Sequence, residues 1–269
     1  MSDSLAGQLS RRSALKLGAA FVAALAVPWS TSLISTDERT PLRLASALPL
    51  PGYRALPQPE SLLQSAAGLD AALVPAYVAA MLIASGQAQP IRGAAGRAHD
   101  PEGRFTVPFA YRLSALRYPS GAAAPAAPSW SAAWPALDLA AGQGWSRVLI
   151  GAALLRRGHS PNDTHSGHLA QAAADLARLP ARGTAQALAL VDPAELGQPT
   201  GLRLPTEGVM LIEYDWVLLA DRAPARQFVE AQPVAPLPRL GLPARLIPLM
   251  PLPAAARARH AAIAASLAA

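Results

Sequence analysis

Cysteine is absent from this chain, and its absence excludes disulfide bonds, thiolate metal sites and catalysis by a cysteine nucleophile. Charged residues are also sparse, at 15% of the 269 residues. The net charge of +6 is spread along the chain without a cluster of arginine or lysine. Nucleic-acid binding needs such a cluster, so the sequence predicts no nucleic-acid partner.

Catalytic signatures are missing as well. The sequence contains no G-x-S-x-G nucleophile elbow, no H-E-x-x-H zinc motif and no glycine-rich loop of the kind that holds phosphate. We therefore expect neither an enzyme activity nor a bound cofactor. Aromatic residues make up only 5% of the chain, so each one is a scarce source of surface on which a ligand could stack.

Lysine is nearly absent, since the 23 basic residues include a single lysine, Lys16. That lysine ends a short motif, S-R-R-S-A-L-K, formed by residues 10–16. The motif resembles the S-R-R-x-F-L-K pattern of twin-arginine export signals, with Ala14 in place of phenylalanine. The residues that carry the likeness are Ser10, Arg11, Arg12, Leu15 and Lys16.

The apolar run that follows, residues 17–27, is closed by Pro28. A membrane-spanning helix needs about 20 apolar residues, so export is favoured over permanent anchoring. Small residues at the −3 and −1 positions allow cleavage after Ala26 or after Ser32. We expect residues 1–32 to be a twin-arginine signal peptide and linker, the twin-arginine translocase to be a partner, and the mature protein to be periplasmic.

Strand patterns and helix patterns alternate along the rest of the chain, which indicates an α/β fold. Gly86 and Gly158 each follow a helical pattern, as C-terminal stop residues do. A low-complexity stretch of Ala, Pro and Gly at residues 119–128 divides the pattern in two. We predict strands at 42–44, 69–75, 105–111, 113–118 and 209–219, and helices at 77–86, 145–157, 169–179, 223–231 and 254–267.

Five segments, in order, resemble the periplasmic spermidine/putrescine-binding proteins of ABC importers. They read GLDAALVPAYVAAMLIASGQAQPI (68–91), DPEGRFTVPFAY (100–111), VLIGAALLRRGHSPN (148–162), PTEGVMLIEYDWVLLADRAPARQFV (205–229) and LPAAARARHAAIAASL (252–267). The resemblance implies a two-lobed, type II-like periplasmic binding-protein fold. Lobe 1 would hold residues 41–116 with a return segment after residue 215, and lobe 2 residues 117–214 with the terminal helix at 252–267. The stretch between residues 44 and 68 is shorter than in the family, which is consistent with a reduced first lobe.

The same resemblance implies a substrate-binding component that delivers a small cationic solute, such as putrescine or spermidine, to an ABC permease in the inner membrane. Tyr77 matches a site tyrosine of the family, and Asp215 matches its amine-binding aspartate. Glu213 stands where the family has tryptophan, and Tyr214 lies between the two carboxylates. Because side chains alternate along a strand, Glu213 and Asp215 should share one face and Tyr214 and Trp216 the other.

Two departures from the family pattern leave alternatives open. Ala45, Ser46 and Ala47 replace paired aromatic residues, and no acidic residue precedes the helix predicted at 145–157. One alternative is therefore a degenerate relative that binds no ligand and has a structural or interaction role. A second alternative is a periplasmic metal-binding protein that uses the loop with His159, Asp163, His165 and His168, although a metal is not the favoured interpretation.

Replacing Arg11 and Arg12 together with lysine should trap the precursor in the cytoplasm. The reason is that the receptor recognises the paired guanidinium groups and lysine is not equivalent to arginine there. Cell fractionation and immunoblotting of the variant measure this. Export of the Lys-Lys variant at the wild-type level would contradict the assignment.

Overall fold

The computed structural model describes residues 41–92, 96–119, 127–138, 146–179, 186–197, 201–236 and 245–268. They belong to one compact unit that begins at Pro41. The predicted export signal lies outside the described residues. Among the helices described, none is long and apolar enough to cross a membrane.

A single mixed sheet forms the centre of this unit, in the strand order β2-β1-β3-β8-β4-β6-β5. The pairs β1–β2, β1–β3, β5–β6 and β8–β9 are parallel, and the pairs β3–β8, β4–β8, β4–β6 and β4–β7 are antiparallel. The strands are β1 (Leu44–Ser46), β2 (Arg54–Ala55), β3 (Ala71–Pro75), β4 (Thr106–Arg117), β5 (Leu137–Asp138), β6 (Gln186–Val191), β7 (Leu202–Arg203), β8 (Val209–Leu218) and β9 (Leu246–Pro248).

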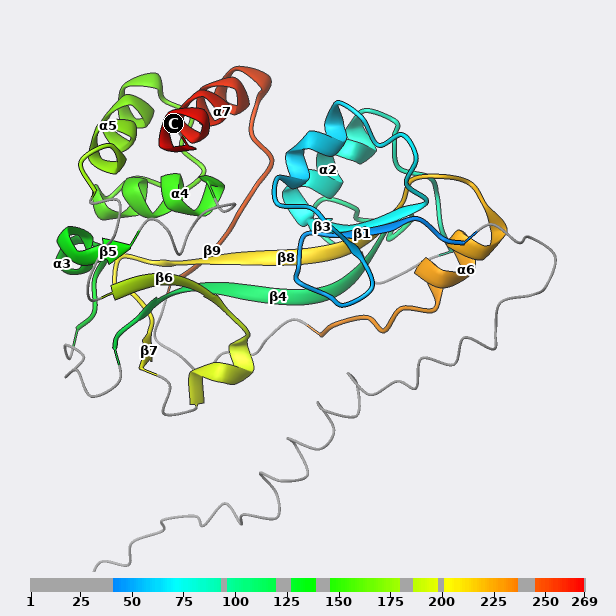
Figure 1. Cartoon of the computed structure of the whole chain (residues 1–269), viewed down its shortest axis with the longest axis horizontal. Coiled ribbons are helices and arrows are strands. Elements are labelled where there is room, and N and C mark those ends of the chain that lie inside the picture. The colour runs from blue at the N-terminus through cyan, green and yellow to red at the C-terminus, as the bar shows by residue number, and fades with distance from the viewer. Residues whose placement is uncertain are drawn as a thin grey trace, which may run out of the picture. The chain divides into compact units, whose positions relative to one another are not determined.

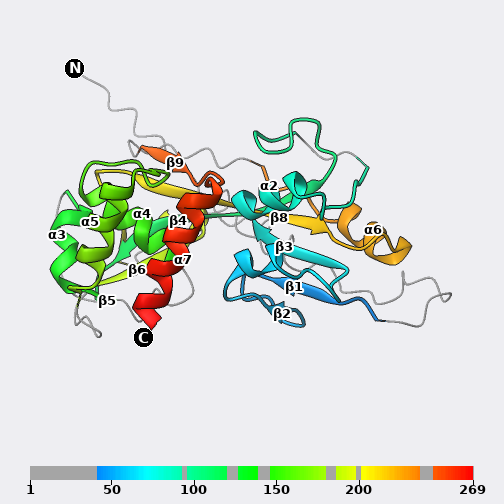
Figure 2. The ribbon, with the colours of Figure 1, turned by 90° about the horizontal axis from the view of Figure 1, so that it is seen from above.

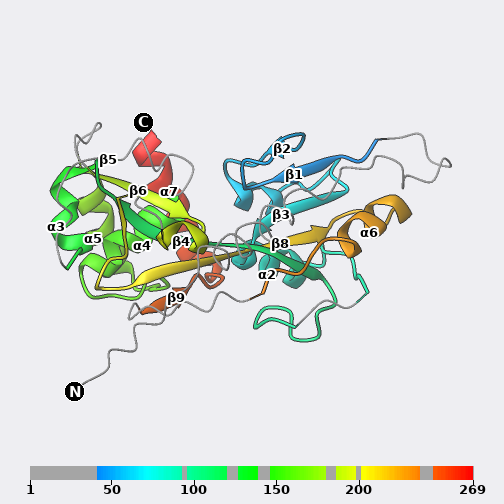
Figure 3. The ribbon, with the colours of Figure 1, turned by 90° about the horizontal axis from the view of Figure 1, so that it is seen from below.

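The long strands β4 and β8 connect two groups of helices (Figure 1). Seen from opposite sides, α3, α4, α5 and α7 are grouped at one end of this strand pair and α2 and α6 at the other (Figures 2 and 3). The helices are α2 (Ala76–Ala84), α3 (Trp130–Ala133), α4 (Ser146–Arg156), α5 (Ser166–Leu176), α6 (Ala223–Glu230) and α7 (Ala254–Ala268), with 3₁₀ turns η2 (Pro59–Leu63), η3 (Trp134–Ala136) and η5 (Pro193–Gly197). The α/β class and the five helices expected from the sequence are confirmed. The residue limits predicted for the two lobes stay a prediction.

Strand β4 corrects one expectation, because the sequence predicted two strands at 105–111 and 113–118 where the structure has one. The register between β4 and β8 shifts between Pro108 and Ala110. Proline lacks the N–H that a continuous ladder requires, and in sheets it is tolerated at such irregularities. The ladder recovers at Ala110 and continues to Leu113, so the strand bends without ending.

The half of the molecule that holds β1, β2 and β3 is organised around Trp216 of β8, which is fully buried. Its ring lies 5.5 Å from that of Tyr53, 6.1 Å from that of Phe109 and 5.1 Å from that of Phe228, measured between centroids. Tilted and edge-on arrangements such as these are the favoured geometry for aromatic pairs. This cluster packs α6 and the β1–β2 connection against the sheet.

Helices α4 and α5 of the other half are joined through the buried carboxylate of Asp175. It accepts hydrogen bonds from Nε and Nη2 of Arg157 at 2.6 and 2.8 Å, and Arg156 Nη1 lies 2.8 Å away. The bonds from Arg157, opposed by burial and helped by Arg156, hold the pKa of Asp175 below its ordinary value. The sign of this shift means that the pair stabilises the fold above about pH 4 and less as the pH falls.

Replacing Asp175 with asparagine should lower the free energy of unfolding by roughly 1–3 kcal/mol, because two charge-assisted bonds are lost at a buried position. Urea unfolding of wild type and Asp175→Asn at pH 7 measures this. The matched control is Asp221→Asn, whose carboxylate is largely exposed and forms an ion pair with Arg226; we expect a change below about 0.5 kcal/mol there. Equal effects of the two substitutions would show that Asp175 does not join the helices.

Candidate functional site

A cavity of about 120 Å³ lies between the two halves. One half contributes the segment after β1, the turn η2 and the start of α2, and the other contributes the first turn of α4. Strands β6 and β8 supply Leu190, Ile212 and Tyr214. The other lining residues are Ala47, Leu56, Pro57, Pro59, Glu60, Pro75, Tyr77, Ser146, Arg147 and Val148.

Tyr77, at the start of α2, is one polar wall of this cavity. Its hydroxyl donates a hydrogen bond of 2.8 Å to Oε1 of Glu60 in η2. Burial, reinforced by the carboxylate of Glu60, raises the pKa of Tyr77 well above its ordinary value. Tyr77 is therefore a neutral phenol at physiological pH, with an apolar ring and a hydroxyl that orients Glu60.

Arg147, in the first turn of α4, is the opposing charge and is only 5% exposed. Its Nη1 donates to the carbonyl oxygen of Pro161, and its Nη2 donates to Oδ1 of Asn162 at 2.9 Å and to the carbonyl oxygen of Met250 at 3.5 Å. Burial lowers the pKa of Arg147 to about 10, and Tyr77 and Glu60 partly offset this. The guanidinium is still charged at pH 7, and its buried Nε has no hydrogen-bond partner among the described residues.

Asn162 holds this arginine in place. Its Oδ1 also accepts a 2.9 Å bond from the amide of Met250, and its Nδ2 donates to the carbonyl oxygen of Pro248 at 2.9 Å. The turn before α5 and the segment after β9 are thus tied together at the arginine. This arrangement places one fixed positive charge beside the cavity.

The other face of β8 carries Glu213 and Asp215, as alternation along the strand predicts. Oε1 of Glu213 accepts hydrogen bonds from Arg97 Nε at 2.8 Å and from the Tyr111 hydroxyl at 2.9 Å. Asp215 is fully buried, with its Oδ2 2.6 Å from Nε2 of His99 in an ion pair. Neither carboxylate lines the cavity.

Of the four residues predicted from the sequence to bind ligand, the structure therefore brings Tyr77 and Tyr214 together at the cavity and places Glu213 and Asp215 on the opposite face of the strand. The ligand contact predicted for the two carboxylates stays a prediction. Sequence analysis missed Glu60 and Arg147. Glu60 lies in a proline-rich stretch without periodicity, whereas Arg147 carries a visible signal, because it is the only charge in an otherwise apolar helix between residues 146 and 155.

Comparisons with known proteins identify the fold. No protein-family model and no curated protein sequence matches the chain. Among solved structures, a candidate spermidine/putrescine ABC transporter protein from Listeria monocytogenes is similar with a TM-score of 0.60 and 13% sequence identity, over 80% of this chain and 90% of the other. The Tp0655 (TpPotD) lipoprotein of Treponema pallidum is similar with a TM-score of 0.56 and 14% identity, over the same shares of the two chains. The chain has the two-domain periplasmic binding-protein fold, as predicted from the sequence.

The pair His99–Asp215 should make stability depend on pH. Burial lowers the pKa of His99, but Asp215, Glu213 and Asp100 outweigh it and raise that pKa above its ordinary value. Burial also raises the pKa of Asp215, against the opposing effect of His99. Both shifts mean that the folded pair binds more protons than the unfolded chain, so the free energy of unfolding should fall as the pH rises through the folded pKa values.

The double variant His99→Gln/Asp215→Asn removes both titrating groups and should flatten the dependence of unfolding free energy on pH between pH 6 and 9. Urea unfolding at several pH values measures the slope. His260→Gln is the matched control above about pH 8, where that ring is neutral in the folded protein, because burial lowers its pKa to about 3, and neutral in the unfolded chain, because an unperturbed histidine has a pKa near 6.5. A double variant with the wild-type slope would refute the explanation.

Proposed function

We propose that this protein is the periplasmic substrate-binding component of an ABC importer, exported by the twin-arginine route and delivering a small amine to a permease in the inner membrane. Its fold is that of periplasmic binding proteins, which bind ligand between two lobes. The observation that carries the proposal is the cavity between the two halves, where aromatic rings and charged groups from both converge. Such a convergence in a concave site is typical of ligand binding.

In this proposal Glu60 is the partner of the ligand's ammonium group. A carboxylate is the acceptor that an ammonium requires once water is excluded. The rings of Tyr77 and Tyr214 lie at the same cavity and offer faces that attract cations and cover methylene groups. Tyr77 also fixes the carboxylate, since it donates to one of its oxygens.

The positive charge of Arg147 restricts which amines can bind in the cavity. A linear diamine would bring its second ammonium toward a buried guanidinium, and two positive charges repel strongly where solvent is scarce. A linear ω-amino acid instead offers a carboxylate to the unpartnered Nε of Arg147. We therefore propose an ω-amino acid of about putrescine's length as the preferred ligand. The diamine predicted from the sequence is the competing class.

Isothermal titration calorimetry of the purified protein should give tighter binding of 4-aminobutanoate than of putrescine. Glu60→Gln should weaken binding tenfold or more, because loss of one member of a desolvated charge pair costs about 2–5 kcal/mol. The matched control is Glu213→Gln, which makes the same chemical change on the opposite face of β8 and should leave the affinity within about twofold.

Other outcomes have separate meanings. Tighter binding of putrescine would restore the polyamine assignment made from the sequence. If Glu213→Gln or Asp215→Asn weakened binding and Glu60→Gln had no effect, the ligand would bind at the carboxylates of β8, as the sequence predicted. The absence of binding to any amine or amino acid tested would contradict the proposal and favour a relative with a structural role.

A further inference from the structure

A second cluster of polar side chains lies at residues 158–168, a segment (below called this turn) that comprises the connection from α4 to α5 and the first residues of α5. This turn holds three of the five histidines of the chain. Gly158, with φ of +77°, ends α4 in the left-handed conformation that glycine adopts without strain. The hydrogen bonds of Asn162 then fix the middle of the turn against the segment at residues 248–250.

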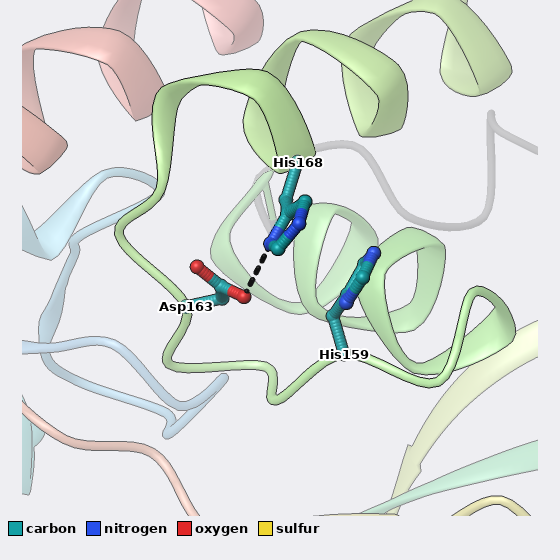
Figure 4. Close-up of side chains that lie close together, drawn as sticks. All are labelled: His159, Asp163 and His168. Carbon is teal, nitrogen blue, oxygen red and sulfur yellow. Dashed lines mark hydrogen bonds and ion pairs between the residues drawn. The ribbon is translucent and has the colours of Figure 1, made fainter.

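Three side chains of this turn, His159, Asp163 and His168, converge (Figure 4). One nitrogen from each imidazole and one oxygen of the carboxylate all lie within 4.8 Å of one another. Nδ1 of His168 is 2.8 Å from Oδ2 of Asp163. The rings of His159 and His168 are stacked, with centroids 3.7 Å apart and planes inclined by 11°.

The backbone of this turn is held by its own hydrogen bonds. The amide of Asp163 donates to the carbonyl oxygen of Ser160 at 3.0 Å, and Oδ1 of Asp163 accepts from the amide of His165 at 2.7 Å. His168 lies in the first turn of α5, so its Cα position is fixed by a helix. A ligand set on a constrained backbone loses less conformational freedom when a metal binds than one on a free chain.

We propose that His159, Asp163 and His168 form a binding site for a borderline divalent transition metal such as Zn²⁺, Ni²⁺ or Co²⁺. Two imidazoles and one carboxylate are the donors that these ions accept, whereas Mg²⁺ and Ca²⁺ require oxygen ligands. Tetrahedral bonds of about 2.1 Å place ligand atoms about 3.4 Å apart. The three donors therefore reach one ion after small side-chain rotations that separate the stacked rings, and water completes the coordination.

This site is separate from the proposed amine cavity, since none of its three ligands lines that cavity. His165 provides an internal comparison. Its ring lies 4.5 Å from that of His168 and is exposed, but its nitrogens are not among the three donor groups that converge. The proposal therefore assigns different roles to two histidines that are three residues apart in the same turn.

The test is calorimetric titration of the full chain, purified without a polyhistidine tag, with ZnCl₂ and NiCl₂ and with MgCl₂ as the oxygen-preferring comparison. We expect one equivalent of Zn²⁺ or Ni²⁺ to bind and Mg²⁺ not to bind. His168→Ala and His159→Ala should each weaken binding at least thirtyfold, and His165→Ala should change it less than threefold. Co²⁺ should give visible d–d absorption that His168→Ala abolishes.

Melting curves recorded in EDTA show whether each variant is folded, and saturating Zn²⁺ should raise the midpoint of wild type and His165→Ala but not that of folded His168→Ala. Asp163→Asn, which keeps the shape of the side chain, should weaken binding without loss of the fold. An absence of Zn²⁺ and Ni²⁺ binding, or equal losses in His165→Ala and His168→Ala, would overturn the assignment. Unchanged amine binding in His168→Ala keeps this test independent of the proposed function.

Discussion

The antiparallel pairing of β4 with β8 is the constraint on which the rest of the structure depends. These two strands are the longest in the described residues, and their register runs from Thr106 opposite Val217 to Leu113 opposite Leu211. Strand β3 adds to one end of β8, while β6 and β7 add to the far end of β4. Each half of the molecule therefore completes its sheet on a strand that also belongs to the other half.

Side chains alternate along β8, so residues that are adjacent in sequence lie on opposite faces of the strand and have different surroundings. Tyr214 faces the cavity, whereas Glu213 and Asp215 form ion pairs with Arg97 and His99 on the other side. Three consecutive polar residues of a single strand thus line the cavity on one face and form ion pairs on the other. A buried carboxylate requires a partner in the protein, and here the partners come from the segment that precedes β4.

The sequence was sufficient to predict the α/β class and the main helices, because helix periodicity and stop glycines such as Gly86 and Gly158 are local signals. The binding-protein fold was implied by the resemblance of five ordered segments to a known family. Strand β6 at Gln186–Val191 was not predicted, since its alternation of leucine with alanine resembles the alanine-rich background of this chain. Its burial comes from pairing with β4, which is not a local property. The two short strands β7 and β9 likewise exist only as partners of long strands.

The site was predictable in part for a related reason. Tyr77 and Tyr214 became candidates through the resemblance to the binding-protein family, but which face of β8 meets the cavity depends on tertiary packing. Glu60 lies beside the cavity in the 3₁₀ turn η2. The prolines around this turn leave no hydrophobic periodicity from which its structure could be predicted. Arg147 could have been found, because a lone charge in an apolar helix must be buried with partners or directed to a ligand.

The anchoring of Arg147 also has a consequence for how the chain is made. One of its acceptors is the carbonyl oxygen of Met250, and the side chain that steadies it, Asn162, depends on the same late segment. A nascent chain that has not yet been synthesised past residue 250 cannot assemble the charged wall of its cavity. Assembly of this wall therefore depends on a contact between residues that are 103 positions apart in the chain, and it follows the synthesis of the segment at residues 248–250.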